Sequence, residues 1–337
     1  MIKIGNPSIT EKEKAHLLSA IAEGDIANGG FIDAFEKKWS SMNSRAYGVS
    51  CNSGTSALQL ALLALGVGKG DEVIVPEFTM AACAFAVSNT GATPVFVDCL
   101  DDLTMDPKEC LKKISKRTKA ILIVPIYGRP VADEVYGIAR SNNLFIVEDF
   151  AEAHGIQPMG DITCYSFQAN KIVTTGEGGM CITDDHFIAE QIRQLSSLCF
   201  DANRTMIHGR VGNNFRMTNL QAAIGLAQCE RFKELKDKRM QIARWYNVYL
   251  PRKYQMPERE VVWVYDIQTE NQEATRKLLA QHEIESRYGF KPMSMQPPYI
   301  QEYQDLNAYK WSKKILYLPT YYDLTEDEVK SICLCLR

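Results

Sequence analysis

The sequence has few histidines, no paired cysteine spacing and no long apolar run, and each absence excludes a class of protein. Five histidines and ten scattered cysteines in 337 residues provide no cluster with the spacing of a zinc site. The two cysteines nearest in sequence, Cys333 and Cys335, are too close for such a site. No apolar stretch reaches the roughly 20 residues of a transmembrane helix. We therefore expect no bound metal and no membrane partner.

The charges are balanced and mixed along the chain. There are 38 lysines and arginines against 41 acids, for a net charge of −3. Without a basic stripe or a helix-turn-helix pattern, nucleic-acid binding is not expected. Most cysteines lie in apolar runs such as Ala82-Cys83-Ala84, which indicates small buried hydrophobic residues in a reducing cytosol. The opening Met1-Ile-Lys-Ile-Gly5 precedes a charged helix, so we expect no signal peptide and a cytoplasmic location.

The first half of the chain alternates short apolar strands with helices. β-Branched runs separated by helices are typical of βαβ units, whose parallel sheet is covered on both faces. Ligands of such sheets bind at the carboxyl ends of the strands. Strands are predicted at 47–50, 72–76, 94–98, 120–125 and 144–148, and helices at 10–23, 31–42, 54–65, 80–88 and 133–141, with another opening at Asp106-Pro107.

The character of the chain changes after Cys181. Longer helices and isolated strands follow, which favours a smaller α+β unit. We therefore divide the chain into a large domain, residues 1–235, and a small C-terminal domain, residues 236–337. Helices are predicted at 185–197, at 218–250 with a break that could fall near Phe232, at 271–282 and at 326–336, and one strand at 261–266, around a proline-rich segment at 291–298.

One lysine stands on a turn between two apolar segments. Lys171 follows Ser166-Phe167 and precedes Thr174-Thr175 and the glycines at 176–179. A turn lysine beside hydroxyls and a Gly-rich loop suits a lysine that forms a Schiff base with a carbonyl cofactor. From this stretch alone, a β-hairpin with a solvated lysine at its tip is the better interpretation.

An acid stands at the end of the strand before that lysine. Asp149 follows the apolar run 144–148. At the carboxyl end of a strand, such an acid can pair with the ring nitrogen of a pyridine cofactor and keep it protonated. The alternative is an aspartate that only caps the next segment.

A phosphate site is indicated further upstream. The segment Ser53-Gly54-Thr55-Ser56 follows a predicted strand and opens a helix, so its free N–H groups and hydroxyls could hold a phosphate. An ordinary N-cap is the commoner explanation. The glycines at 66–70 follow a helix and precede a strand, the reverse of a dinucleotide fingerprint, and are interpreted as a helix stop and turn. A nicotinamide dehydrogenase is therefore disfavoured.

Phosphate cradle, strand-end acid and turn lysine, in that order, resemble a pyridoxal-phosphate enzyme of the aspartate-aminotransferase fold (fold type I). Nearly the whole chain resembles the DegT/DnrJ/EryC1/StrS family of sugar aminotransferases. This resemblance implies an α/β large domain with a mostly parallel sheet, a smaller C-terminal α+β domain, and a homodimer with shared active sites. It is carried by 53–58, 70–76, 91–98, Glu148-Asp149, Ala153-His154-Gly155, Ser166-Phe167, Asn170-Lys171, 176–179 and 214–223.

The resemblance also implies roles for individual residues. Lys171 would hold the cofactor covalently and move protons, and Asp149 would bond the pyridine nitrogen. Arg287 matches an arginine near the substrate, with a surface salt bridge as the alternative. Further cofactor contacts would come from Gly54, Thr55, the Ser56 backbone, Glu152 near the ring hydroxyl, Ser166, Asn214 from the other subunit, and Met80, which could instead be a core methionine.

Within the family, segments 78–80 and 170–179 and Glu152 look most like perosamine synthases. Those enzymes transfer an amine, here expected from glutamate, to C4 of a GDP-linked 4-keto-6-deoxy sugar. Amination at C3, or of a dTDP- or UDP-linked sugar, stays open. A dehydratase of the family would have histidine at Lys171, and a non-catalytic regulatory protein is a further alternative. The chain departs from the family at Phe150, in a shortened 154–166 segment and at Ser294.

Overall fold

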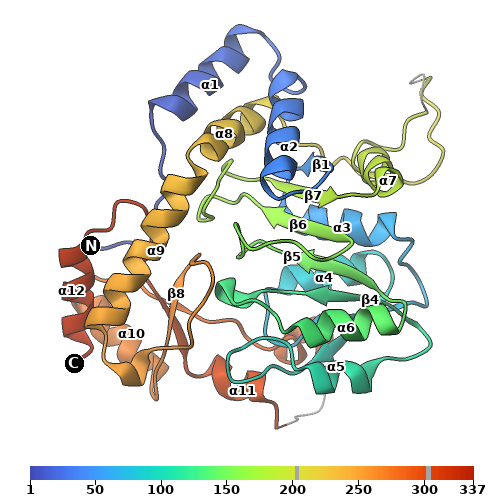
Figure 1. Cartoon of the computed structure of the whole chain (residues 1–337). Coiled ribbons are helices and arrows are strands. Elements are labelled where there is room, and N and C mark those ends of the chain that lie inside the picture. The colour runs from blue at the N-terminus through green and yellow to red at the C-terminus, as the bar shows by residue number, and fades with distance from the viewer. Residues whose placement is uncertain (202–204, 301–304) are drawn as a thin grey trace.

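A seven-stranded sheet forms the centre of the computed structural model, which describes residues 1–201, 205–300 and 305–337 (Figure 1). The strand order is β1-β7-β6-β5-β4-β2-β3. Only β7 runs antiparallel to its neighbours, so the predicted mostly parallel sheet is confirmed. The strands are β1 (Tyr47–Cys51), β2 (Glu72–Pro76), β3 (Thr93–Val97), β4 (Thr118–Ile123), β5 (Phe145–Asp149), β6 (Ile162–Ser166) and β7 (Gly179–Thr183).

Helices cover both faces of this sheet. Side chains alternate along each strand, so Val73 and Val75 of β2 pack on one face and Ile74 on the other. The first face is covered by α3 (Gly54–Ala64), α4 (Ala81–Asn89) and α7 (His186–Ser196). The second is covered by α2 (Gly30–Met42), α5 (Pro107–Lys113) and α6 (Asp133–Ser141), with α8 (Asn219–Glu230) packed on α2.

Most helix ends follow the predicted signals. Thr10 and Glu13 form the capping box of α1 (Glu11–Ala22), and Asp106 caps α5 with Pro107 at its first turn. The long helix expected over 218–250 is interrupted at Arg231, where α8 ends and α9 (Phe232–Tyr249) begins. The break near Phe232 is therefore confirmed.

The C-terminal part forms a second, antiparallel sheet of order β8-β10-β9. Its strands are β8 (Tyr265–Gln268), β9 (Arg287–Tyr288) and β10 (Ile315–Leu318). Helix α10 (Gln272–Gln281) packs on β10, and α12 (Glu326–Cys335) packs on α9 and α10, whereas α11 (Asn307–Ser312) begins with N–H groups that donate to Asp98 after β3. The N-terminus joins it, because Ile2 bridges Ile284. The boundary placed after residue 235 falls inside α9, and the division into domains stays a prediction.

One strand prediction needs correction. We expected a strand over 261–266, but β8 begins only at Tyr265. The preceding apolar residues are buried without strand pairing: the Gly128 carbonyl accepts the N–H of Val261, and the Trp263 carbonyl accepts from the Arg239 side chain. The proline-rich segment forms two short 3₁₀ turns, Met293–Met295 and Pro297–Tyr299.

The described residues contain neither a candidate membrane span nor a candidate metal cluster. No helix in the described ranges is long and apolar enough to cross a membrane. The same residues contain no group of three or more histidines, cysteines or acids that could hold a metal ion. All ten cysteines are free thiols, and only Cys335 is not buried.

Candidate active site

Lys171 lies in the connection between β6 and β7, which pair as an antiparallel hairpin. The hairpin alternative was therefore correct about topology, but the lysine is not a solvated tip. Its amine lies 3.7 Å from the centroid of the Trp263 ring, and the side chain is partly buried. Burial lowers the pKa of the Lys171 amine, and the nearby carboxylates of Glu152 and Asp149 oppose that shift.

Asp149 is the last residue of β5 and is 6% exposed. Its Oδ1 accepts the Ala151 N–H at 3.0 Å, and its Oδ2 accepts the Cys83 thiol at 3.1 Å. Burial raises the pKa of this carboxyl group, which these two donors and the Lys171 charge counteract. A buried carboxylate with lone pairs left over is suited to a cationic ring N–H.

Glu152 follows within one turn of Asp149 and is 5% exposed. Its Oε2 accepts the backbone N–H of Tyr127 at 2.8 Å. Tyr127 has a φ of +52°, so this contact holds the chain after β4 in a left-handed conformation that a tyrosine seldom adopts. Burial raises the pKa of Glu152 to about 7, so near neutral pH its carboxyl group can donate or accept a proton.

The start of α3 meets the end of β6. Ser53 caps the helix, its Oγ accepting the Ser56 N–H at 3.1 Å, so the N-cap explanation holds. The first helical N–H groups, of Gly54 and Thr55, have no preceding turn to donate to. A Cβ on Gly54 would lie 2.7 Å from the Cβ of Ser166, so only glycine permits this approach. The structure thus brings the predicted cradle and Ser166 together.

His154 forms hydrogen bonds to residues on both sides of the lysine in the β6–β7 connection. Its Nε2 donates to the Ser166 carbonyl at 3.0 Å, and its Nδ1 accepts the Val173 N–H at 3.4 Å. The side chain is 1% exposed, and burial lowers the pKa of the imidazole to about 3. It is therefore neutral at physiological pH and supports the lysine loop rather than exchanging protons.

Two further predicted residues lie at the edge of the site. Met80 precedes α4 and is 54% exposed, so it is not a core methionine. The Arg287 side chain is 57% exposed and lies 4.0 Å from Glu285, in keeping with the surface-pair alternative. Arg287 also lines, with Asn170 and Trp263 among others, a cavity of about 50 Å³ next to the lysine turn.

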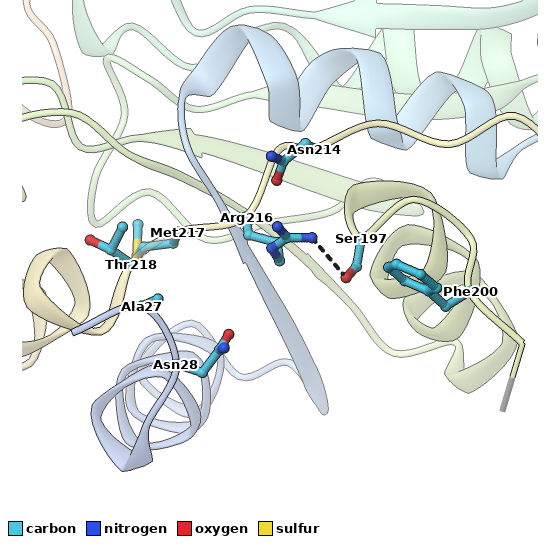
Figure 2. Close-up of a pocket in the computed structure, with 8 residues that line it drawn as sticks. All are labelled: Ala27, Asn28, Ser197, Phe200, Asn214, Arg216, Met217 and Thr218. Carbon is cyan, nitrogen blue, oxygen red and sulfur yellow. Dashed lines mark hydrogen bonds between the residues drawn. The ribbon is translucent and has the colours of Figure 1, made fainter. Parts of the chain in front are cut away.

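Asn214 lies in a different cavity, of about 450 Å³ (Figure 2). It shares this cavity with Arg216, whose guanidinium donates to Ser197 Oγ at 3.3 Å. α8 is capped by the side chain of Thr218 itself, so Asn214 is not needed as its cap. The structure does not bring Asn214 into the cavity beside Lys171. The lining residues are Ala27, Asn28, Ser197, Phe200, Asn214, Arg216, Met217 and Thr218.

Two of the three departures noted in the sequence, Phe150 and Ser294, have defined surroundings. Phe150 is fully buried and meets Tyr165 edge-to-face, with ring centroids 5.9 Å apart. The N–H of Ser294 donates to Glu77 Oε1 at 2.8 Å, and Glu77 is itself 2% exposed at the end of β2. This contact joins the proline-rich segment to the carboxyl edge of the main sheet.

Sequence reasoning missed three side chains of this region. Cys83 was interpreted as a small buried hydrophobic residue; it is buried, but it donates to Asp149. Trp263 was placed inside a predicted strand, and Arg239 inside a helix, without any link to the lysine. Both contact the Asn170 carbonyl. Only the burial expected for Trp263 was visible in the sequence.

Comparisons with known proteins agree on one family. The profile described as the DegT/DnrJ/EryC1/StrS aminotransferase family matches residues 7–337. Proteins named GDP-perosamine synthase are 38% identical in Caulobacter vibrioides, over 99% of this chain and 97% of the relative, and 36% identical in Escherichia coli O157:H7, over 98% and 96%. A UDP-N-acetyl-3-dehydro-alpha-D-glucosamine 3-aminotransferase of Acidithiobacillus ferrooxidans is 34% identical, over 90% and 87%.

Solved structures give the same result. S. venezuelae DesV superposes with a TM-score of 0.91 at 29% identity, covering 97% of this chain and 94% of its own. The PLP form of Spr1654 from Streptococcus pneumoniae superposes with a TM-score of 0.92 at 26% identity, covering 99% and 98%. The predicted fold class is therefore confirmed.

Proposed function

The chain belongs to the DegT/DnrJ/EryC1/StrS aminotransferase family and is a pyridoxal-phosphate-dependent sugar-nucleotide aminotransferase, and we propose that it aminates C4 of a GDP-linked 4-keto-6-deoxy sugar with glutamate as the donor. The observation that carries this proposal is the grouping of Lys171 with two buried carboxylates, those of Asp149 and Glu152. The choice of sugar is supported by relatives named GDP-perosamine synthase that match over nearly the full chain.

The residues present fit pyridoxal phosphate. Asp149 would take the ring N–H and Glu152 would lie by the ring hydroxyl. The free N–H groups at the start of α3, with Thr55 and Ser166, would take the phosphate. The buried Asn170 Oδ1, beside the lysine, has no hydrogen-bond partner among the described residues, as expected of a site that holds a polar ligand.

In the proposed mechanism, Lys171 provides the acid–base chemistry. When bound, the cofactor supplies an electron sink for the charge that develops as a carbon atom loses its proton. The Lys171 Nζ would take that proton from the donor's α-carbon, hold it as an ammonium group and then return it to carbon, so that no proton is gained or lost by the protein. Burial lowers the pKa of the amine, which keeps more of it in the neutral form that can accept a proton.

The residues around Lys171 would orient the cofactor and the substrate and would balance their charges. The Asp149 carboxylate keeps the ring nitrogen protonated, and the thiol of Cys83 and the N–H of Ala151 hold that carboxylate in place. The Glu152 carboxylate is held by the Tyr127 N–H, and its charge acts on the Lys171 amine. Arg287, which lines the cavity next to the lysine turn, is proposed to contact the substrate.

A substrate screen tests the choice of sugar. Purified enzyme would be given glutamate and GDP-, dTDP- or UDP-linked sugars carrying the ketone at C3 or C4, and aminated products would be read by mass. The proposal expects the GDP-linked 4-keto sugar to turn over fastest. Faster amination of a 3-keto sugar would favour the alternative that the 34%-identical 3-aminotransferase supports. No turnover and no bound cofactor would favour a regulatory protein.

We further propose that the enzyme is a cytosolic homodimer whose subunits share their sites through Asn214. Asn214 lies in a cavity apart from Lys171, and a two-fold dimer would present this same loop to both partner sites. An amide can donate to a phosphate oxygen without adding charge. The ten free thiols accord with a reducing compartment.

Mixed dimers test the shared site. Lys171→Ala and Asn214→Ala chains would be unfolded, refolded together and assayed at limiting cofactor. If Asn214 acts in the partner's site, each heterodimer has one intact site, and activity should return to about a quarter of the parent value. Each variant refolded alone is the control. If mixing restores nothing although Asn214→Ala alone is impaired, the residue acts within its own chain.

A further inference from the structure

A single tryptophan contacts the lysine turn in two ways. The indole Nε1 of Trp263 donates to the backbone carbonyl of Asn170 at 3.1 Å, and the face of the same ring lies 3.7 Å from the Lys171 amine. The Trp263 side chain is 7% exposed. One rigid side chain therefore holds the residue before the lysine and meets the end of the lysine side chain.

Trp263 is itself held by the C-terminal part of the chain. Its carbonyl accepts from Arg239 Nη1 at 2.7 Å, and Arg239 Nη2 also donates to the Asn170 carbonyl, at 3.4 Å. The Trp263 ring packs against Tyr317 of β10, with centroids 6.2 Å apart. The lysine turn is therefore anchored to α9 and β10 through one indole and one guanidinium.

The Lys171 amine has few other partners. It forms no ion pair with any residue that the structure describes, although Glu152 and Asp149 are near enough for their charges to act on it. Arg239 is a like charge whose repulsion also acts on the amine, and the neutral His154 lies near enough to feel the lysine's charge. The aromatic face is thus its direct contact, and such a face attracts an ammonium group by roughly 0.5–2 kcal/mol.

We propose that Trp263 is a positioning residue for the catalytic lysine: its indole N–H fixes the Asn170–Lys171 turn, and its ring provides a resting place for the amine whenever Lys171 is released from the cofactor. This inference rests on the proposed role of Lys171. The Trp263 ring stabilises the protonated, ammonium form of the Lys171 amine. Burial and the charge of Arg239 act in the opposite direction and stabilise the neutral form. Because capture of the cofactor aldehyde requires the neutral amine, the ring also sets the pH at which the apoenzyme captures it.

Two substitutions separate the two roles. Trp263→Leu removes both the ring and the donor, whereas Trp263→Phe keeps an aromatic face and loses the N–H. Trp245→Leu is the matched control, because Trp245 also has a lysine amine over its ring, that of Lys238 at 4.7 Å, but lies on α9 away from the site. All variants would be made as apoenzyme and titrated with pyridoxal phosphate.

The readouts are the pH midpoint of covalent capture, measured by borohydride reduction and peptide mass, and the dissociation constant of the cofactor. Trp263→Leu should move the midpoint to lower pH by about one pH unit, because loss of the ring disfavours the ammonium form. Trp263→Phe should move it less. Both should bind the cofactor several-fold more weakly, because the Asn170 carbonyl keeps only its longer bond to Arg239. Trp245→Leu should match the parent in both.

The outcomes distinguish the inference from the proposed function. If the parent captures no cofactor on Lys171, the proposed function itself fails. If the parent does and both Trp263 variants keep its midpoint, the resting place for the amine is wrong, even where melting temperature falls. If Trp263→Leu does not fold, Trp263→Phe decides: parent-like affinity would overturn the role of the indole N–H, and weaker affinity at an unchanged melting temperature would support it.

Discussion

Asp149 and Lys171 reach the same site on two different kinds of backbone. Asp149 ends β5, which is hydrogen-bonded to β4 on one side and to β6 on the other. Lys171 lies outside any strand, in a turn where its N–H donates to the Gln168 carbonyl at 2.8 Å. The acid is therefore supported by the sheet, and the lysine depends on support from elsewhere.

That support comes from distant parts of the chain. The donors to the Asn170 carbonyl, Trp263 and Arg239, lie 93 and 69 residues further along. Changes in the C-terminal part should consequently disturb the lysine without disturbing the acid. The difference teaches that a rigid sheet can place a residue that only holds charge, whereas a residue that must move is held by contacts that can be made and broken.

The largest effect is expected when the lysine is removed. Lys171→Ala should lower turnover by at least about 10³-fold, because proton transfer and covalent attachment are lost together. The purified variant should lose the covalent linkage to pyridoxal phosphate that borohydride traps. Asp149 should remain in place, since its hydrogen-bond donors are the Cys83 thiol of α4 and the Ala151 N–H just after β5.

Lys277→Ala, which removes an exposed lysine of α10, is the control for this variant and should behave like the parent. If borohydride still traps the cofactor in Lys171→Ala, at a different lysine, the assignment of Lys171 as the cofactor-bearing residue is wrong. The site would then have to be assigned to that other residue.

Replacing the acid should slow the chemistry while keeping the linkage. Asp149→Asn keeps the shape and removes the charge, so the ring nitrogen is no longer held protonated. We expect both half-reactions to slow by roughly 10²-fold or more, with covalent capture by Lys171 retained. Single-turnover absorbance with glutamate, and then with the keto sugar, measures the two rates separately. Parent rates would mean that another group holds the ring nitrogen.

The third prediction concerns the pH dependence of stability that the Glu152 carboxyl group causes. Its pKa is raised from 4.5 to about 7 by burial. Between these values the unfolded chain has already lost the proton that the folded chain keeps, so stability is full below about pH 4.5 and falls as pH rises toward 7. The cost to the apoenzyme should be on the order of 1–3 kcal/mol.

Melting temperatures of the apoenzyme from pH 4.5 to 8 measure this cost. Glu152→Gln should flatten the profile, since the amide does not titrate and can still accept the Tyr127 N–H. Glu258→Gln, at an exposed acid, is the control and should keep the parent profile. A Glu152→Gln profile as steep as that of the parent would assign the pH dependence to other groups.

The sequence could predict the features that depend on local structure, but not those that depend on contacts between distant segments. The strand ending at Asp149, the helix starting after Ser53 and the caps at Thr10 and Asp106 depend on local patterns, and the structure confirms these elements. The four-residue strand β10 was missed, because Ile315–Leu318 is too short to give a pattern of its own. The apolar run at 261–264 was wrongly taken as strand, since burial alone explains its composition.

The parts that could not be predicted are contacts between distant segments. Trp263 and Arg239 meet the lysine turn only because the C-terminal part folds back on the main sheet. Cys83 meets Asp149 only because α4 packs against the end of β5, and its position in an apolar helix indicated packing alone. The proposed role of Asn214 lies across an interface between two subunits, which a single chain does not contain.

The smallest effect is expected at Cys83, which tests how firmly the sheet alone holds the acid. Cys83→Ala removes the thiol that donates to Asp149 Oδ2 at 3.1 Å, a hydrogen bond to a charged group worth about 1 kcal/mol for a weak donor. Cofactor affinity should fall about 5-fold, and Cys83→Ser should restore it. Cys110→Ala, at an equally buried cysteine within α5, is the control for lost packing. If Cys83→Ala binds the cofactor like the parent, β5 and the Ala151 N–H suffice to place the acid; if Cys83→Ser is as weak as Cys83→Ala, the loss comes from packing rather than from the hydrogen bond.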